Sequence, residues 1–353
     1  MENNNKKPLL SIRDLKQYFP VKGKKNMFVR ANDGITMDIY DGETFGLVGE
    51  SGCGKSTLGR TLLQLYPQTH GKTIYYGRAP EDILPDCARY PEEYQAIGAV
   101  CDGGIDLSRL KYDEMRRLRR DLQLVFQDPY SSLDPRMTVG QIIGEGLLAH
   151  KVFARAGREM QDYIIEIMES CGLAPYMLHR YPHQFSGGQR QRIAIARSLA
   201  LQPKFVVCDE AVSALDVSIQ SQILNLLSDL KKKGNLTYLF ISHDLSVIRY
   251  ISDRIGVMYL GNLVELANVD DLFGQPLHPY TDALLKAIPT TDLDKPKAEV
   301  ILEGDIPSPI SPPEGCKFHT RCLYATDECK QVEPAFEEAA PEHYVACHHT
   351  LAT

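Results

Sequence analysis

The sequence contains no long apolar run. No stretch approaches the roughly 18 to 20 consecutive apolar residues that a membrane-spanning helix needs. The opening MENNNKKPLL has no apolar core of the kind that a secretory signal carries. Basic residues are not in excess either, because 39 Lys and Arg stand against 46 Asp and Glu, a formal net charge of −7. We therefore expect a cytosolic chain without a general nucleic-acid-binding surface.

The composition gives no sign of disorder. Hydrophobic residues make up 43% and charged residues 24% of the 353 residues, which is close to the average for folded soluble proteins. A chain of this length can bury a substantial core. We expect one large domain with a smaller one, or two domains of ordinary size.

A phosphate-binding loop is the strongest motif. Residues 44–57, TFGLVGESGCGKST, run from an apolar strand through a glycine-rich turn into a helix. The pattern G-x4-G-K-[ST] lets backbone N–H groups surround a polyphosphate at the helix N-terminus. Lys55 would reach the β- and γ-phosphates and Ser56 would ligate Mg²⁺; the alternative is a glycine-rich turn with an exposed lysine. The residues of this predicted site are Gly49, Ser51, Gly52, Gly54, Lys55, Ser56 and Thr57.

A second apolar strand ends in two carboxylates. KFVVCDE, residues 204–210, has the form of a buried parallel strand with acids at its C-terminal end, where open α/β sheets bind ligands. Asp209 is placed to hold the Mg²⁺ shell, and Glu210 to orient the attacking water as a general base. An acidic turn is the alternative for this pair alone. Together with the phosphate loop, the pair predicts hydrolysis of a nucleoside triphosphate.

A second glycine pair lies in FSGGQRQR, residues 185–192. Ser186, followed three residues later by Gln189, matches a capping box that starts a helix. The same serine hydroxyl and the glycine amides can also present hydrogen-bond donors to an anion. The two interpretations are compatible, because a ligand can use the donors of a cap residue.

These motifs resemble, in order, the ATP-binding subunits of ABC transporters. Gln127 after an apolar strand, the SALD turn and His243 complete the pattern, which covers residues 49–243. The resemblance implies an α/β P-loop NTPase of ABC type, with a RecA-like core sheet, an antiparallel β subdomain and a helical subdomain at about residues 128–201 that touches the membrane subunits. It also implies that ATP binds between two ATPase domains arranged head to tail, so that the signature of one caps the γ-phosphate held by the other.

The resemblance assigns roles to individual residues. The implied catalytic residues are Glu210, His243 and Gln127, and the implied Mg²⁺ ligands are Ser56, Gln127 and Asp209. The implied contacts to the partner's ATP are Ser186, Gly187, Gly188 and Gln189, with Asp216 at the dimer contact.

An aromatic residue that stacks on adenine is expected in DLKQYFP, residues 14–20. Tyr18 and Phe19 both fit, and we favour Phe19; either residue could instead belong to the core. One departure from the family pattern is Ala211, where proline usually follows the acid pair.

The tail resembles the C-terminal extension of oligopeptide and dipeptide importer ATPases, whose tag is His278, Pro279 and Tyr280. This resemblance implies an ATPase domain at residues 1–270 and an extension at 271–353. It also implies peptide uptake through two permease subunits, an extracellular or periplasmic substrate-binding protein, and a position on the cytoplasmic face of the membrane. The second ATPase would be a paralogue, with an identical copy as the alternative. Related nickel and glutathione importers share the extension.

Four of the nine cysteines lie in the last part of the chain: Cys316, Cys322, Cys329 and Cys347. Four thiolates suit either Zn²⁺ or a [4Fe–4S] cluster, and spacings of x5, x6 and x17 do not choose between them. The family resemblance favours the iron–sulfur cluster. Buried thiols in a small proline-rich lobe are the alternative.

Residues 72–107 depart from the family and have the composition of an inserted surface loop, with Cys87 and Cys101 as exposed thiols. Two other functions are alternatives for this chain. One is a soluble ABC-type ATPase acting on nucleic acid with a zinc module. The other is a metal-binding regulatory protein whose ATP site no longer turns over.

Overall fold

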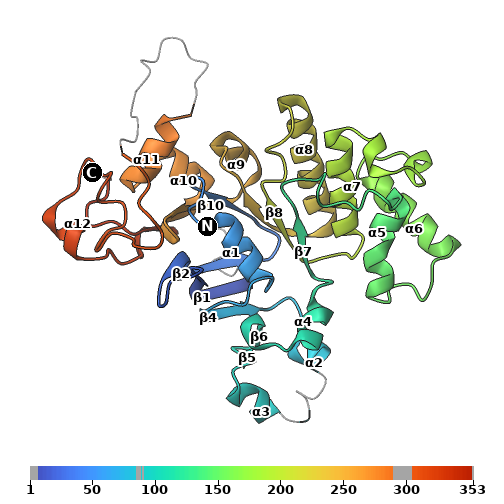
Figure 1. Cartoon of the computed structure of the whole chain (residues 1–353), viewed down its shortest axis with the longest axis horizontal. Helices are drawn as coiled ribbons and strands as arrows, with labels where there is room; N and C mark the ends of the chain where they lie inside the picture. Colours follow the sequence, from blue (N-terminus) through green and yellow to red (C-terminus); the bar gives the residue numbers. More distant parts are fainter. Residues whose placement is uncertain (1–6, 85–88, 90, 289–303, 352–353) are drawn as a thin grey trace. The chain divides into compact units, whose positions relative to one another are not determined.

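A computed structural model describes residues 7–84, 89, 91–288 and 304–351 (Figure 1). The chain forms two compact units. Unit 1 comprises residues 1–10, 39–43 and 74–240, and unit 2 comprises residues 11–38, 44–73 and 241–353. Among the described residues, none of the helices combines the length and the apolar character that crossing a bilayer requires.

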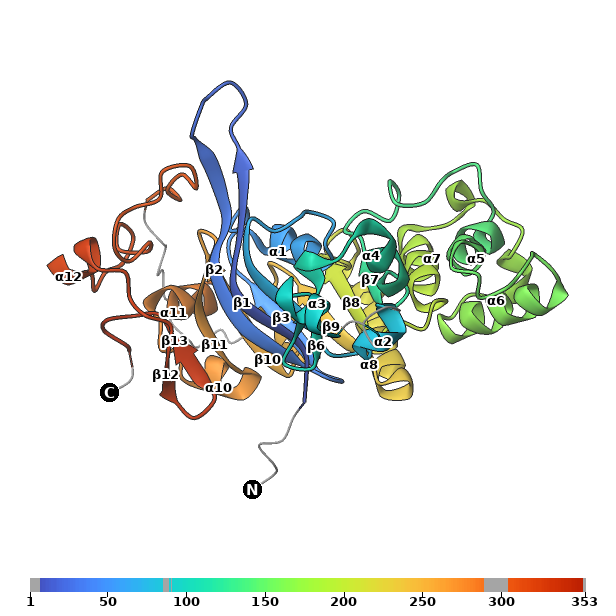
Figure 2. The ribbon, with the colours of Figure 1, turned by 90° about the horizontal axis from the view of Figure 1, so that it is seen from below.

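The first strands of unit 2 form a long hairpin. β1 (Pro8–Pro20) and β2 (Phe28–Tyr40) are hydrogen-bonded neighbours, and Figure 2 shows them running side by side well beyond the neighbouring strands. Ile12 and Leu15 of β1 and Ile35 of β2 are fully buried. Polar residues such as Asp14 and Lys16 of β1 are more exposed. The hairpin therefore buries its apolar side chains and presents a row of charged ones.

The second set of strands in unit 2 has the order β12-β13-β11-β10-β3. Its members are β3 (Thr44–Val48), β10 (Arg254–Tyr259), β11 (Asn262–Asn268), β12 (Glu337–Ala340) and β13 (His343–Val345). β3 and β10 are parallel, with Gly46 opposite Ile255, and both strands are buried throughout. The helices of this unit are α1 (Lys55–Leu62), α9 (Leu245–Ile251), α10 (Val269–Gly274), α11 (Pro279–Lys286) and α12 (Asp327–Gln331).

The core strands of unit 1 are mostly apolar. β7 (Leu122–Val125), β8 (Phe205–Asp209) and β9 (Thr237–Ile241) follow the order β9-β8-β7. β7 and β8 pair in parallel from Leu122 opposite Phe205 to Val125 opposite Cys208. Every residue of β8 and β9 is buried, as expected for strands covered on both faces. The carboxyl end of β8 is where Asp209 lies.

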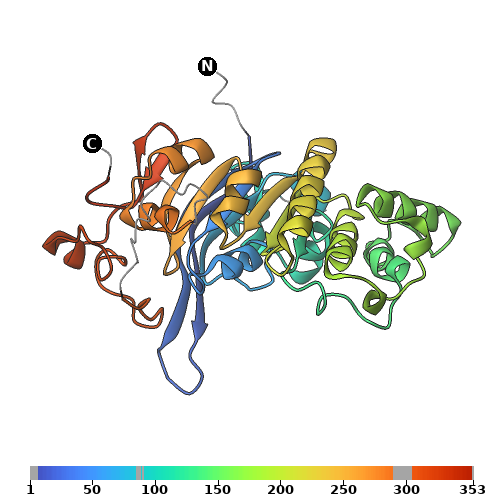
Figure 3. The ribbon, with the colours of Figure 1, turned by 90° about the horizontal axis from the view of Figure 1, so that it is seen from above.

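The helices of unit 1 include the predicted helical region. α5 (Val139–Ala149), α6 (Arg158–Ser170) and α7 (Gly187–Leu199) lie together as the green helices of Figure 3, and α8 (Val217–Gly234) follows. In α6 the buried residues Met160, Ile164 and Met168 recur every fourth position. A Cβ at Gly144 of α5 would meet the Met160 Cε at 2.3 Å. The small residue therefore lets α5 and α6 pack closely.

The segment predicted as a surface loop at residues 72–107 is more ordered than expected. β4 (His70–Tyr75) pairs antiparallel with β6 (Gly104–Asp106), and β6 pairs with β5 (Val100–Cys101). The short helices are α2 (Pro80–Ile83), α3 (Pro91–Ala96) and α4 (Tyr112–Leu118). Ile83, Ala99 and Ile105 are buried. The prediction of a solvent-facing loop was therefore wrong for these elements. Their scattered apolar residues, which show no clear periodicity in the sequence, form a small core. Cys87 lies outside the described residues.

One buried carboxylate ties this segment to the core strands. Asp121, which is 1% exposed, accepts hydrogen bonds from the Tyr75 hydroxyl (2.9 Å) and from Nε and Nη2 of Arg78 (2.7 and 2.8 Å). Its backbone carbonyl accepts the N–H groups of Lys204 and Phe205, both at 3.0 Å. Asp121 therefore links the end of β4, the residues after it and the start of β8.

Candidate nucleotide-binding site

The phosphate loop has the backbone conformation that the glycine pattern predicts. It joins β3 to α1, and Gly49 and Gly54 have φ angles of 146° and 104°. A Cβ at Gly49 would lie 2.2 Å from the Met258 carbonyl oxygen, and one at Gly54 would lie 2.1 Å from that of Ala31. Only glycine fits both positions, because the backbone conformation and the space each exclude a side chain. The strand, loop and helix were predicted correctly.

The Lys55 side chain folds back onto the backbone of the phosphate loop. Its Nζ donates to the backbone carbonyls of Gly49 (2.7 Å) and Glu50 (3.0 Å), and its side chain lies beside the Cys53 sulfur (3.6 Å). The residue is 5% exposed. The ammonium is therefore held at the mouth of the loop, where phosphate oxygens can replace the carbonyls as its acceptors.

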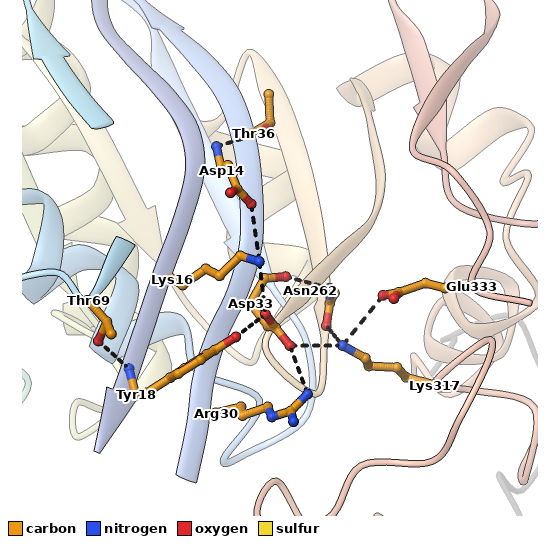
Figure 4. Close-up of polar contacts among 10 residues, drawn as sticks. All are labelled: Asp14, Lys16, Tyr18, Arg30, Asp33, Thr36, Thr69, Asn262, Lys317 and Glu333. Atoms are coloured by element: carbon orange, nitrogen blue, oxygen red, sulfur yellow. Dashed lines mark hydrogen bonds and ion pairs between the residues drawn. The ribbon is translucent and has the colours of Figure 1, made fainter. Parts of the chain in front are cut away.

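The two aromatic candidates for adenine stacking have different surroundings. The Phe19 ring packs edge-to-face on Tyr66, with centroids 5.3 Å apart, in the chain that follows α1. The Tyr18 hydroxyl donates to Asp33 at 2.5 Å, as Figure 4 shows. Burial raises the pKa of Tyr18, and the hydrogen bond to Asp33 acts in the same direction. Tyr18 is therefore committed to a polar network, and Phe19 is the aromatic residue on the side of α1.

In unit 1 the structure brings Gln127 and Glu210 together. The side-chain amide of Gln127 donates to Glu210 Oε2 at 2.7 Å. Gln127 follows β7 and Glu210 follows β8, and these strands are adjacent and parallel. Asp209, at the end of β8, is 1% exposed. Glu210 has a φ of 49°, so the chain turns sharply away from the strand at this residue. Adjacent parallel strands thus deliver the predicted water-orienting groups to one edge.

The glycine-pair segment does form the predicted capping box. Ser186 is the N-cap of α7; its Oγ accepts from Gln189 N at 3.4 Å, and Gln189 Oε1 accepts from Ser186 N at 3.1 Å. Ser186 and Gly187 are exposed, whereas Gly188 is buried. A Cβ at Gly188 would meet Ile219 Cγ2 at 2.4 Å. The first two residues therefore face solvent, and the second glycine allows close packing of α7 on α8.

The other predicted site residues lie at element ends. Asp216 is the N-cap of α8 and accepts from Ile219 N at 3.0 Å. His243 is exposed and lies between β9 and α9. The residues in unit 1 are Gln127, Ser186, Gly187, Gly188, Gln189, Asp209, Glu210 and Asp216. Those in unit 2 are Phe19, Gly49, Ser51, Gly52, Gly54, Lys55, Ser56, Thr57 and His243.

Sequence reasoning missed two residues that touch the phosphate loop. The Tyr280 hydroxyl accepts from Glu50 N at 2.9 Å, and the Arg321 guanidinium binds the Glu50 carboxylate at 2.7 and 3.0 Å. Hydrogen bonding to Glu50 raises the pKa of Arg321. The only signal in the sequence was the tag His278, Pro279 and Tyr280, which belongs to the start of α11. Nothing local to Arg321 marks it as a partner of Glu50.

The tag itself begins α11. His278 is its N-cap, with Nδ1 accepting from Tyr280 N at 3.0 Å, and Pro279 occupies the first helical position. His278 is 1% exposed, and burial lowers its pKa to about 4. Glu265 accepts the N–H groups of Leu277 (2.7 Å) and His278 (3.0 Å). The tag is thus a buried helix start whose third residue reaches the phosphate loop.

The four C-terminal cysteines are neighbours. Cys316 N donates to the Cys329 carbonyl at 2.8 Å. Burial above all, together with the nearby Cys316, Cys322 and Cys329, raises the pKa of Cys347 to about 11. None of the eight described cysteines forms a disulfide. Across the described ranges, no three His, Cys, Asp or Glu side chains converge tightly enough to hold a metal ion. The arrangement of these four cysteines therefore supports neither of the two expected metal sites, the zinc ion or the iron–sulfur cluster.

The fold and the phosphate loop define an ABC-type P-loop ATPase. The family model described as ABC transporter matches residues 32–213, which include the phosphate loop, the glycine-pair segment and the acid pair. The dimeric ABC cassette MJ0796 solved with ADP and Pi has the same fold, with a TM-score of 0.60 at 25% identity over 74% of this chain and 98% of that one. This confirms the predicted fold class.

The extension and close relatives define the group within that class. The family model described as oligopeptide/dipeptide transporter, C-terminal region, matches residues 264–329. The oligopeptide transport ATP-binding protein AppF of Bacillus subtilis is 46% identical over 351 residues, 98% of each chain. OppF of Salmonella typhimurium is also 46% identical, over 97% of this chain and 96% of its own. The chain belongs to the ATP-binding subunits of oligopeptide and dipeptide ABC transporters, as the sequence predicted.

Proposed function

We propose that this subunit binds and hydrolyses ATP to power uptake of oligopeptides or dipeptides through partner permease subunits, from a position on the cytoplasmic face of the membrane. The observation that carries the proposal is the hydrogen bond from Glu50 N to the Tyr280 hydroxyl. It joins the phosphate loop, which is common to ABC ATPases, to the tag of the peptide-transporter extension. The extension is thus part of the ATP-binding unit.

In the proposed mechanism the phosphate loop and Lys55 hold the β- and γ-phosphates, and Phe19 stacks on adenine. Ser56, Gln127 and Asp209 would hold Mg²⁺, which would offset negative charge on the phosphates. Glu210 accepts a proton from the attacking water, while Gln127 fixes the orientation of its carboxylate. His243 contacts the γ-phosphate. Phosphoryl transfer depends mainly on such positioning and charge stabilisation.

The second half of each ATP site comes from another ATPase subunit in this proposal. Ser186 and Gly187 are exposed at the start of α7, where unpaired N–H groups favour an anion. The hydroxyl of Ser186 already accepts from Gln189 N, and its own proton is available to a ligand. Asp216 lies at the same contact. A paralogue is the proposed partner, and an identical copy is the alternative.

A groove in unit 1 suits a permease segment. It encloses about 1030 Å³ between α5 and α6, and its apolar lining includes Leu148, Met160, Ile164 and Leu178. Leu148 is 39% exposed. We assign this groove to a cytoplasmic segment of a permease subunit, because a mostly apolar cleft with a polar rim is a typical helix-binding surface. A substrate-binding protein outside the membrane completes the proposed transporter.

The cofactor at the four cysteines is proposed to be a [4Fe–4S] cluster. The proposal is supported by the proximity of the thiols, because Cys316, Cys322 and Cys347 each have a pKa raised in part by other cysteines of the set, and four cysteine thiolates are the ligands of such a cluster. Cys316, Cys322, Cys329 and Cys347 would be its ligands. When bound, the cluster would cross-link the lobe; no step of ATP hydrolysis is assigned to it.

Reconstitution tests the proposal. The chain would be purified together with the proteins encoded by neighbouring genes, and these partners would be identified. The complex would then be placed in proteoliposomes with the binding protein. We expect ATP-dependent uptake of labelled di- to pentapeptides, with loss of uptake when Glu210 is replaced by Gln. Nickel or glutathione uptake without peptide uptake would reassign the cargo. ATPase activity stimulated by nucleic acid, with no membrane partner recovered, would favour the soluble alternative.

A further inference from the structure

Two residues of the C-terminal extension form hydrogen bonds with one residue of the phosphate loop. Glu50 follows Gly49 in the loop. Its N–H donates to the Tyr280 hydroxyl at 2.9 Å, and its carboxylate receives two hydrogen bonds from Arg321, at 2.7 and 3.0 Å. Tyr280 and Arg321 both belong to the extension at residues 271–353. The loop that receives phosphate is therefore braced by chain far away in sequence.

The contact between Arg321 and Glu50 is largely shielded from solvent. The Arg321 side chain is 4% exposed and that of Glu50 is 24% exposed. The guanidinium lies over the Tyr259 ring at 5.9 Å. The rings of Tyr259, Tyr280 and Phe318 contact one another with centroids 4.9 to 5.2 Å apart. A two-point arginine–carboxylate contact fixes geometry as well as charge, and aromatic packing behind it limits its movement.

Glu50 also touches the lysine that binds phosphate. Its carbonyl accepts from Lys55 Nζ at 3.0 Å, and the same carbonyl accepts from Cys53 N at 3.3 Å. The side chain, amide and carbonyl of this one residue are therefore all engaged. A shift of the Glu50 side chain would move the backbone atoms that position Lys55 and the turn before Gly54.

We propose that Arg321 is a positioning residue for ATP. By holding Glu50, it keeps the phosphate loop in the shape that receives the β- and γ-phosphates, and the extension thereby sets the ATP affinity of the subunit. Arg321 directly precedes Cys322, so this side chain connects the fold of the four-cysteine lobe to the shape of the phosphate loop. This inference concerns ATP binding and does not depend on the identity of the transported molecule.

Lys317 offers a matched control on the same segment. Its Nζ contacts Asn262 Oδ1 (2.9 Å), Asp33 Oδ2 (3.3 Å) and Glu333 Oε1 (3.5 Å), as Figure 4 shows. The side chain is 12% exposed. The hydrogen bond from Tyr18 and the Lys317 ammonium lower the pKa of Asp33, although burial opposes them. Lys317 therefore also fixes this segment by hydrogen bonds and ion pairs, but its partners lie outside the phosphate loop.

The test compares ATP affinity in the full-length protein. Arg321→Met, Arg321→Lys, Glu50→Gln and Lys317→Met would be assayed for the Kd of a fluorescent ATP analogue, for KM and kcat in the assembled transporter, and for Tm. We expect Arg321→Met and Glu50→Gln to raise the Kd and KM about 10- to 100-fold, the usual effect of removing a residue that supports a binding group. Arg321→Lys keeps the charge and should recover part of the affinity. Because Glu50→Gln preserves the shape of the side chain, it still tests the Arg321–Glu50 contact if Arg321→Met does not fold.

Lys317→Met should lower Tm and leave the Kd within about twofold of wild type. The double variant Arg321→Met/Glu50→Gln should be no weaker than the more impaired single variant, because both changes remove one interaction. Wild-type affinity for Arg321→Met and Glu50→Gln overturns the proposal. So does an equal loss of affinity in Lys317→Met, which would show a general effect of loosening the segment. Peptide transport is not measured in this test. The result for Arg321 could therefore still be interpreted if the proposed peptide transport were wrong.

Discussion

Gln127 donates a hydrogen bond from Nε2 to Oε2 of Glu210 across 2.7 Å. The two residues follow adjacent parallel strands, β7 and β8, so their proximity comes from strand pairing. The amide holds one oxygen of the carboxylate, Oε2, in place. The contact thus orients the group that we propose as the catalytic base.

Replacing Glu210 by Gln should stop hydrolysis and preserve ATP binding. We expect kcat to fall at least about 100-fold, because a general base contributes about 10² to 10⁴ to the rate, while the Kd for ATP stays near that of wild type. The closed dimer should accumulate in size-exclusion chromatography with Mg-ATP. Asp229→Asn removes an exposed carboxylate from α8 and serves as the control. Wild-type turnover by Glu210→Gln in the assembled complex would contradict the assignment.

Mixing two inactive variants should restore one ATP site if the signature serves the neighbouring chain. Ser186→Asn retains a capping side chain at the start of α7 and alters the hydroxyl offered to the partner; Lys55→Ala disables the phosphate loop. In a mixed pair, one site combines an intact loop with an intact signature. For a pair of identical copies, we expect each variant alone to be inactive and the mixture to hydrolyse ATP. With a paralogous partner, the two changes on different subunits should disable the same site and leave the other intact, whereas both changes on one subunit should disable both sites. A mixture no more active than its components argues against shared sites.

His278 should make stability depend on pH. Burial lowers its pKa to about 4, with Glu265 opposing the shift, whereas an unfolded histidine titrates near 6.5. Between these values the unfolded chain binds a proton that the folded chain excludes. The free energy of unfolding therefore falls as pH decreases through this window, by up to about 1.4 kcal/mol per pH unit.

Urea unfolding between about pH 7 and about pH 5 would measure this dependence. His278→Asn keeps a side-chain acceptor at the helix N-cap and removes the titration. Wild type should lose more stability than this variant over the same interval. Equal losses would mean that His278 does not resist protonation in the folded state.

Anaerobically purified protein should contain about four iron and four sulfide ions per chain. Cys322→Ser should lose most of the iron, and Cys101→Ser, at a half-exposed thiol outside the lobe, should retain it. Elemental analysis with a sulfide assay provides the measurement. A metal-free chain that is still folded, or a chain with zinc in place of iron, would remove the cluster proposal.

Asp121→Asn should destabilise the protein by about 1 to 3 kcal/mol, the cost of leaving buried polar groups without their charged partner. Asp121 is 1% exposed and binds both Tyr75 and Arg78. Asp113→Asn, at an exposed site on α4, is the matched control. Chemical denaturation of both variants gives the comparison, and equal stabilities would show that the Asp121 contacts contribute little.

The predictions that succeeded concern features encoded within a few consecutive residues. Gly49 and Gly54 stand where the backbone has positive φ, and the Ser186–Gln189 capping box spans a single turn of chain. The strand before Asp209 is a continuous apolar run. Residues 72–107 were harder to predict, because short elements with two or three buried side chains lack a readable period. The metal at the four cysteines could not be predicted either, since spacing along the chain does not set the distances between thiols.

The phosphate loop, the acid pair, the glycine-pair cap and the family could all be predicted from the sequence, because glycine conformation, helix capping and strand hydrophobicity depend on neighbouring residues. The folded structure was needed to show that Glu50 is held by Arg321 and Tyr280, that Gln127 orients Glu210, and that Tyr18 binds Asp33. Each of these pairs is joined by strand pairing or side-chain packing between distant segments. Contacts of that kind exist only once the whole chain has closed around its core.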